Sequence, residues 1–114
     1  MKNKDKRLWE LIVSTTEHYA DAFSLPLWKV KPGFKKWKGR FRGSCSKRGL
    51  LRVTLRNRFG KRFEPYAYVD TIAHELAHLR FLNHRKNWFW LHVSILSKME
   101  ADGVYEKFRR IKKK

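Results

Sequence analysis

The spacing of apolar residues predicts a helix in the N-terminal part of the chain. Apolar or small residues recur at steps of three and four at positions 8, 11, 12, 15, 19 and 23. This is the stripe that an amphipathic helix buries against a core. Because Pro26 ends helical structure, we expect the helix to run from Asp5 to Phe23.

The middle of the chain instead alternates apolar and polar residues, as strands do. Every second residue from Leu51 to Leu55 is apolar, while Arg52, Thr54 and Arg56 are polar. This pattern is typical of a half-buried strand with a cationic outer face. Shorter strands are expected at 27–30 and 40–44, with turn residues at 31–34.

Helical spacing returns in the last third of the chain. Pro65 suits the first turn of a helix whose buried stripe is Val69, Ile72, Ala73, Leu76 and Leu79. A further helix is expected from Lys86 to Met99, stopping near Gly103, with Phe89, Val93 and Leu96 in the core. At least one neighbouring tryptophan should line a cleft or stay partly exposed. Residues 107–114 read as a basic, frayed tail. The order of elements predicts an α+β domain with a small sheet.

Charge divides this single domain unevenly. The 114 residues carry 28 Lys+Arg against 10 Asp+Glu, a net charge of +18, and 42% hydrophobic residues allow a core, which excludes a disordered basic tail. Residues 22–63 hold 14 of the basic residues and no acid. We therefore divide the chain into a basic β-rich segment (22–63), a helical segment (64–103) and a basic tail (104–114).

Several classes of protein are excluded by what the sequence lacks. Cys45 is the only cysteine, so neither an intramolecular disulfide nor a four-cysteine zinc ribbon can form. No apolar run reaches the ~18 residues that span a bilayer, and the N-terminal segment has no secretory pattern. We expect a monomeric cytoplasmic protein, nuclear if the source is a eukaryote, with no membrane partner.

The predicted helix from Pro65 carries an HExxH motif. His74 and His78 lie four residues apart, so both imidazoles can reach one Zn²⁺ from the same face of a helix. Glu75 is one step round the helix, where its carboxylate can reach a water on the metal rather than the metal itself. This segment is thus the predicted metal-binding part of the chain.

His84 is the best candidate for a third ligand. In a continuous helix it would lie about 15 Å along the axis from His74, too far to share a metal. We therefore expect the helix to stop at Leu82 and Asn83, with Asn83 in the left-handed conformation, so that His84 folds back over the other two. A fourth position left to water is typical of a catalytic rather than a structural zinc.

Other polar residues have simpler interpretations. His18 and His92 are expected to be surface or satisfied core histidines. Asp70 is expected to be a solvated acid, with a role in holding a ligand imidazole as the alternative. Cys45 is expected to be a small buried thiol on a strand, with a place near the metal as the alternative.

Two blocks of sequence resemble a known family. The segment from His74 to Leu79, followed by Asn83-His84 and Trp88-Phe89, looks like the active-site segment of SprT-like zinc metallopeptidases, especially their compact YgjP-like branch. The segment Arg42–Ser46 and the strand after it resemble the "WGSCS" segment and first core strand of that branch, with Arg42 where the branch has Trp. The resemblance covers residues 37–91.

The resemblance implies a fold and a chemistry. The fold would be zincin-like: an N-terminal helix, a small antiparallel β-sheet, and an HExxH helix followed by a further helix. The cofactor would be Zn²⁺, and Glu75 would be the general base in peptide hydrolysis. The wider family includes proteases that degrade proteins crosslinked to DNA.

The basic segment predicts binding to nucleic acid. Cations there alternate with aromatic rings, and such surfaces hold phosphates and stack unpaired bases. DNA or RNA that is single-stranded or distorted fits best, without sequence specificity. The candidate contacts are Lys35, Lys36, Trp37, Lys38, Arg40, Arg42, Lys47, Arg48, Arg52 and Arg56.

Together these features predict a zinc metallopeptidase that cleaves proteins bound or crosslinked to nucleic acid. Two alternatives stay open at this point. One is a zincin-like metal-dependent ribonuclease, which also uses three histidines but lacks the glutamate after the first. The other is a non-enzymatic nucleic-acid-binding protein with a structural metal site.

Overall fold

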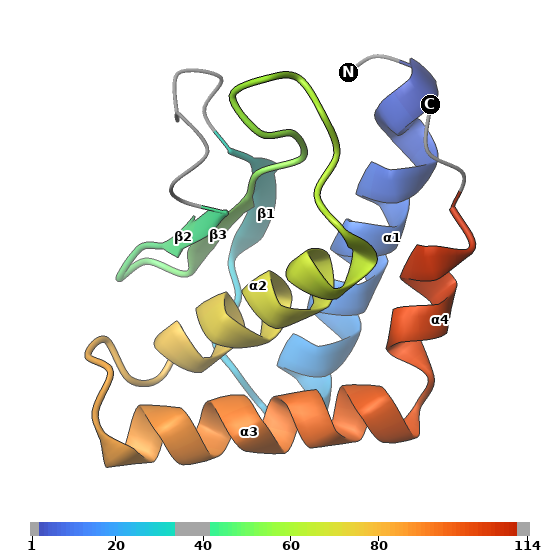
Figure 1. Cartoon of the computed structure of the whole chain (residues 1–114). Helices are drawn as coiled ribbons and strands as arrows, with labels where there is room; N and C mark the ends of the chain where they lie inside the picture. Colours follow the sequence, from blue (N-terminus) through green and yellow to red (C-terminus); the bar gives the residue numbers. More distant parts are fainter. Residues whose placement is uncertain (1–2, 34–41, 112–114) are drawn as a thin grey trace.

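The computed structural model describes residues 3–33 and 42–111 and has an α+β architecture. Its helices are α1 (Asn3–Ala22), α2 (Pro65–His78), α3 (Lys86–Ala101) and α4 (Val104–Arg109), and its strands are β1 (Lys29–Pro32), β2 (Gly43–Cys45) and β3 (Leu50–Val53). The sheet lies on one side of α2, and α3 lies on the other side. Helices α1 and α4 pack near the N-terminal end of α2 (Figure 1). The helix that carries the HExxH motif is therefore the centre of the molecule.

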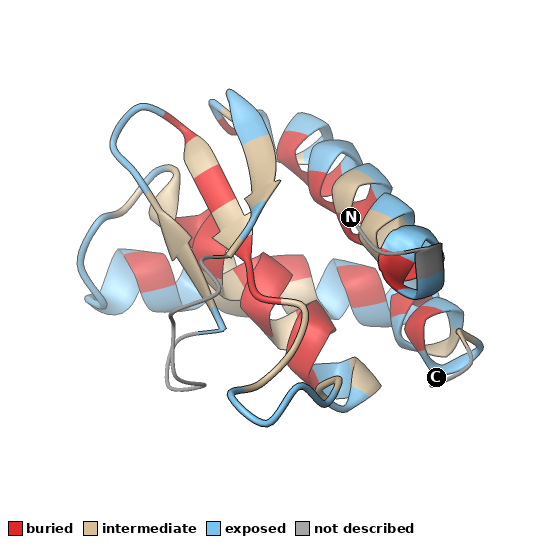
Figure 2. Ribbon diagram, turned by 90° about the horizontal axis from the view of Figure 1, so that it is seen from above, coloured by how far each residue is buried: buried red, intermediate tan, exposed pale blue. Residues whose placement is uncertain are grey.

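The apolar stripes predicted for the first two long helices are confirmed. Leu8, Ile12 and Tyr19 of α1 are buried, and so are Val69, Ile72, Ala73 and Leu76 of α2. The buried positions follow the helix and strand faces that meet in the interior (Figure 2). Each long helix thus keeps the spacing that amphipathic helices need.

The sheet is mixed rather than antiparallel, which corrects the expected sheet type. β2 and β3 form an antiparallel hairpin, with Ser44 opposite Arg52. β1 pairs with the other edge of β3 and runs parallel to it, giving the strand order β1-β3-β2. The hairpin occupies one edge of β3, so β1, arriving from the end of α1, can extend the sheet only at the other edge.

Several element boundaries differ from those expected, and β1 and the predicted tail are two of them. β1 lies two residues later than predicted, because the backbone N–H of Leu27 bonds the Leu25 carbonyl in a tight turn before the strand. The predicted tail contains α4, because Val104 and Phe108 are buried and Phe108 stacks on Tyr68 with ring centroids 6.0 Å apart. The chain is therefore ordered as helix through Arg109.

The core face of α3 was predicted wrongly at Phe89, although Leu96 packs against the core as expected. Phe89 is 50% exposed, and the buried residues of the helix are Trp88, Ile95 and Met99. Their spacing of seven and four marks one helix face, so the apolar stripe begins one residue earlier than expected. The prediction for the tryptophans is confirmed, since Trp90 is exposed and Trp88 faces the histidines described below.

Among residues 3–33 and 42–111, no helix has both the length and the apolar character that crossing a bilayer requires.

Candidate metal centre

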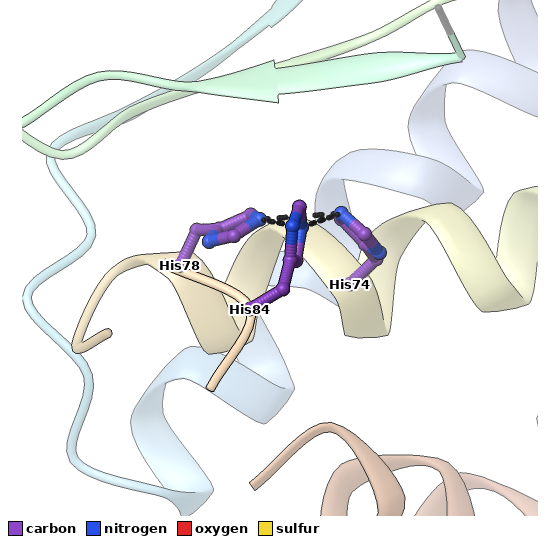
Figure 3. A group of neighbouring side chains, drawn as sticks. All are labelled: His74, His78 and His84. Atoms are coloured by element: carbon purple, nitrogen blue, oxygen red, sulfur yellow. Dashed lines mark hydrogen bonds between the residues drawn. The ribbon is translucent and has the colours of Figure 1, made fainter. Parts of the chain in front are cut away.

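Three histidine side chains converge beside the C-terminal end of α2. His74 and His78 come from the helix and His84 from the loop that follows it, and their rings point toward one another (Figure 3). The Nε2 atoms are 3.2 Å apart for His74 and His78, 2.9 Å for His78 and His84, and 3.2 Å for His84 and His74. The structure thus brings together the three predicted ligands.

This geometry fits a tetrahedral metal ion. Three nitrogens at ~2.05 Å from a tetrahedral zinc are about 3.3 Å apart, close to the observed separations. Three neutral imidazoles whose Nε2 atoms face each other also cannot all be satisfied by mutual hydrogen bonds, because each ring nitrogen either donates or accepts. A cation between three lone pairs satisfies all of them, so the donor set suits a metal.

A backbone contact fixes the tautomer of His78. Its Nδ1 donates a hydrogen bond to the Phe81 carbonyl oxygen at 2.9 Å. Because a carbonyl can only accept, the proton is on Nδ1 and the Nε2 lone pair faces the cluster. The loop therefore both carries His84 and orients His78.

The turn that brings His84 back is built differently from the prediction. The helix ends at His78, and the N–H groups of Leu79 and Phe81 bond the carbonyls of Leu76 and Ala77 at 3.0 Å. Asn83 is not left-handed, because Ser24 is the only non-glycine residue with positive φ in the described part of the chain. The early, tightened helix end leaves enough loop for His84 to reach the cluster without a left-handed residue.

Burial favours the neutral, ligating form of the helix histidines. Desolvation, with the nearby His78, lowers the pKa of His74 to about 4. Desolvation also lowers the pKa of His78, partly opposed by its bond to Phe81. Metal ligation requires deprotonated imidazole nitrogens, so both shifts prepare the site for an ion.

Glu75 lies beside the cluster rather than in it. Its Oε2 is 4.0 Å from Nε2 of His74, and the residue is only 7% exposed. Burial raises the pKa of Glu75 to about 7. A carboxylate that binds and releases a proton near neutral pH, one helix position from the ligands, has the properties of a general base.

Strand β2 forms the wall next to Glu75. A Cβ added to Gly43 would lie 3.1 Å from Cγ of Glu75 and 2.7 Å from the Arg52 carbonyl oxygen, so the strand and helix are in direct contact here. Burial and the charge of Glu75 raise the pKa of Cys45 to about 12. Cys45 lies on a strand, as predicted, but its thiol is only partly buried rather than buried, and it lies near the candidate base.

Trp88 packs against all three histidines, a specific contact that the sequence did not assign to this tryptophan. Its ring centroid lies 4.8 Å from that of His74, 5.4 Å from His78 and 4.5 Å from His84, and its Nε1 donates to the His74 carbonyl at 3.3 Å. The sequence signals were the expectation that one tryptophan would line a cleft and the presence of Trp88-Phe89 in the family resemblance, but the buried face of the helix was assigned one residue too late.

Asp70 and His92 form a pair behind the cluster. Oδ1 of Asp70 is 3.3 Å from Nε2 of His92, and the proximity of His92 lowers the pKa of Asp70. The ring of His92 lies 5.6 Å from that of His74 and 4.9 Å from that of Trp88. Asp70 is half-buried within α2 and belongs to this pair rather than to the ligand set. His18 is exposed, as expected.

The predicted nucleic-acid contacts are distributed unevenly in the structure. Lys35, Lys36, Trp37, Lys38 and Arg40 lie outside the described residues, whereas Arg42, Lys47 and Arg48 are exposed. Arg52 donates to the Pro32 carbonyl at 2.9 Å, and Arg56 forms a bidentate ion pair with Asp5, its shortest contact being 2.7 Å. Contact of all ten residues with nucleic acid stays a prediction.

Comparisons with models of protein families, with curated proteins and with solved structures find no match to this chain.

Proposed function

We propose that this chain is a zinc-dependent metallopeptidase with a zincin-like fold, acting on proteins bound or crosslinked to nucleic acid. The single observation that carries the proposal is the convergence of three Nε2 atoms within 3.2 Å of one another beside a buried glutamate. The resemblance of residues 37–91 to SprT-like peptidases, which includes the upstream segment Arg42–Ser46, agrees with it.

The residues around the cluster have complementary roles in peptide hydrolysis. His74, His78 and His84 would hold Zn²⁺, which when bound supplies a Lewis acid that polarises a peptide carbonyl and acidifies water. Glu75 would accept the proton from the attacking water at its carboxylate and pass it to the leaving amine. Its raised pKa, about 7, suits both the gain and the loss of that proton.

The exposed edge of β2 offers a place for an extended peptide. The N–H of Thr54 bonds the Arg42 carbonyl and the N–H of Ser46 bonds the Leu50 carbonyl, so alternation turns the backbone groups of Gly43 and Cys45 away from β3. No strand in the described part of the chain pairs with that edge. A substrate added there as a strand would pass directly beside Glu75.

A comparison of zinc-loaded wild type with Glu75→Gln tests the activity. The substrates are casein, a DNA-binding protein on single-stranded DNA, and labelled RNA, and Glu100→Gln, an exposed acid on α3, is the matched control. We expect the wild type and the control to cleave both proteins and Glu75→Gln to lose at least 99% of that activity, roughly the effect of removing a general base.

The other outcomes identify the alternatives. Glu75-independent loss of RNA would indicate the metal-dependent ribonuclease. Zinc and nucleic-acid binding without cleavage of any substrate would indicate a structural metal site in a binding protein.

A further inference from the structure

An exposed tryptophan lies against the turn that joins β2 to β3. Trp28 is 66% exposed, and its backbone N–H donates to the Gly49 carbonyl at 2.9 Å. The turn also carries Lys47 and Arg48, both exposed. An indole and two cations are therefore held at the same end of the sheet.

Gly49 makes this close approach possible. Its φ is +90°, and a Cβ there would lie 2.5 Å from the Pro26 carbonyl oxygen and 2.9 Å from the Trp28 nitrogen. Only glycine fits both the left-handed backbone and the available space. The sequence thus specifies the contact between Trp28 and the turn.

The strand register adds cations to the same region. Lys31 is the partner of Arg52 in the parallel pair, and Lys29 lies two residues before it on the same face. Leu51 and Val53, which alternate with Arg52, are fully buried on the opposite face. Alternation along the strands therefore places Lys29, Lys31 and Arg52 on the face directed away from α2.

The surroundings contain little negative charge. No acid occurs between residues 22 and 63, which include the whole sheet. The loop after α2 adds Arg80, whose guanidinium donates to the Ser24 carbonyl at 2.9 Å. The local field is positive, and the partner that it attracts is an anion.

We propose that Trp28, Lys29, Lys31, Lys47, Arg48 and Arg52, together the hairpin surface, bind single-stranded nucleic acid. The cations neutralise phosphates, and the exposed indole stacks on an unpaired base. A duplex keeps its bases stacked on each other and cannot use Trp28 in this way. The inference deepens the nucleic-acid part of the proposed function and is independent of the zinc chemistry.

The position of the hairpin surface relates it to the metal centre. The β2–β3 turn and the loop that carries His84 lie at the same end of the molecule, on the left in Figure 1, and the turn is again on the His78 side in Figure 3. A strand held on the hairpin surface is thus kept near the three histidines, which would raise the local concentration of a protein attached to that strand.

Fluorescence anisotropy of labelled oligonucleotides tests the proposal. The protein is the zinc-loaded full chain carrying Glu75→Gln, so that cleavage cannot interfere, and the probes are dT20, U20 and a 20-base-pair duplex. We expect Trp28→Ala to weaken binding of the single strands by at least about fivefold. Lys47→Glu with Arg48→Glu should weaken it at least about tenfold and reduce the slope of log K against log salt by about 1.4.

Matched variants separate a local effect from a general one. Lys6→Glu with Arg7→Glu changes the net charge equally on an exposed part of α1, and Tyr105→Ala removes an exposed ring from α4. Both should bind single strands within twofold of the parent, and Trp28→Phe should restore most of the affinity. Unfolding curves for each variant verify the fold.

Three results would overturn the proposal for the hairpin surface. The first is a control variant that weakens binding as much as Lys47→Glu with Arg48→Glu does. The others are an unchanged affinity in Trp28→Ala and tighter binding to the duplex or to acidic vesicles than to single strands. The relative affinity of dT20 and U20 distinguishes DNA from RNA as the partner. Because cleavage of free casein by the wild type is measured separately, failure of this surface and failure of the peptidase proposal are distinguishable.

Discussion

At the scale of single residues, His84 is the proposed ligand with the least local support. His74 and His78 are held by α2, whereas His84 lies in the loop before α3 and is exposed. Replacing it with alanine removes one of three nitrogens, so zinc affinity should fall by more than the 10–100-fold typical for loss of a supporting hydrogen bond. Competition with a chelator measures this directly. His18→Ala, an exposed histidine on α1, should leave the affinity unchanged, and an unaltered affinity in His84→Ala would remove this residue from the ligand set.

A buried ion pair is the second feature at this scale. Asp5 of α1 accepts hydrogen bonds from Arg56 at 2.7 and 3.0 Å and also lies 3.3 Å from Arg62, which holds the 57–62 loop against the helix. Asp5 is 6% exposed. Its carboxylate is therefore the anchor for two guanidinium groups that come from distant sequence.

We expect Asp5→Asn to destabilise the fold by about 2–3 kcal/mol at pH 7, because both cations lose their counter-charge. The hydrogen bonds from Arg56, followed by the charge of both arginines, lower the pKa of Asp5. The folded state thus binds the Asp5 carboxyl proton less tightly than the unfolded chain does. The stabilisation by the Asp5 charge is therefore complete above about pH 4, and it is lost as the pH falls through the lower pKa of the folded state. Urea unfolding at pH 7 and at lower pH measures the difference.

The matched control for Asp5 is Asp21→Asn, an exposed acid near the other end of α1. It should change stability by less than about 0.5 kcal/mol. A gap between wild type and Asp5→Asn that stays constant as the pH is lowered would show that packing, and not charge, explains the loss.

The sequence could predict the chemical role of single residues better than the tertiary contacts that those residues make. Spacing alone identified His74, Glu75 and His78, because four residues bring side chains to one helix face. Arg56 was interpreted as a nucleic-acid contact, since nothing in the sequence relates it to Asp5, 51 positions away. Contacts over such separations are set by the tertiary fold and leave no local pattern.

At the scale of elements, α3 contacts the candidate metal centre through Trp88 and His92, and Trp88 makes the larger contact. Trp88 is 8% exposed and contacts the rings of all three ligands. Trp88→Ala should cost about 3–5 kcal/mol in unfolding free energy, as other large-to-small core changes do, and should also lower zinc affinity. Trp90→Ala, two residues along and 56% exposed, should change neither quantity appreciably. Paired unfolding and zinc titrations test this, and equal effects of the two substitutions would contradict a supporting role for Trp88.

The contact of β2 with α2 is the second relation between elements. A Cβ at Gly43 would approach Cγ2 of Thr71 to 2.8 Å and the Arg52 carbonyl oxygen to 2.7 Å. Gly43→Ala must therefore push β2 away from the helix, at a cost of about 1–3 kcal/mol. Cleavage should fall sharply while zinc affinity changes little, because the strand borders Glu75 but provides no ligand.

Ser44→Ala is the control for Gly43, since the side chain of Ser44 lies on the other face of the same strand. Its cleavage rate and stability should match the wild type. Full activity in Gly43→Ala would show that the edge of β2 does not position the substrate.

Periodicity predicted which elements form but not how they pair or where they stop. The stripes on α1 and α2 were recognised because a helix repeats the same environment every three or four residues. The parallel pairing of β1 with β3 joins residues such as Val30 and Leu51, and no local rule favours it over an antiparallel sheet. The end of α2 depends on a loop held by Arg80 bonding Ser24, a contact across 56 residues.

At the scale of the whole molecule, charge and chemistry occupy different parts of one domain. The segment 22–63 carries 14 basic residues and no acid, and in the structure it forms the sheet that covers one side of α2. The histidines lie toward the C-terminal end of that helix and in the loop that leads to α3 (Figure 3). A peptide at the β2 edge and a nucleic-acid strand on the hairpin surface would thus use separate surfaces.

Separate surfaces predict a specific kinetic behaviour. Single-stranded DNA should accelerate cleavage of a protein bound to the same strand, because both are held near the three histidines, but should leave the rate for a free, uncharged peptide within about twofold. Added salt should abolish the acceleration as the phosphate contacts are lost, with little effect on the peptide rate. The measurement is the cleavage rate of both substrates, with and without DNA, across a salt series. Inhibition of peptide cleavage by DNA would instead mean that the strand covers the three histidines and Glu75, and a salt-insensitive acceleration would point to a conformational change rather than to co-localisation. In Lys47→Glu with Arg48→Glu the acceleration should disappear at every salt concentration while the peptide rate persists, which connects the effect to the positive end of the sheet and not to the net charge of +18 as a whole.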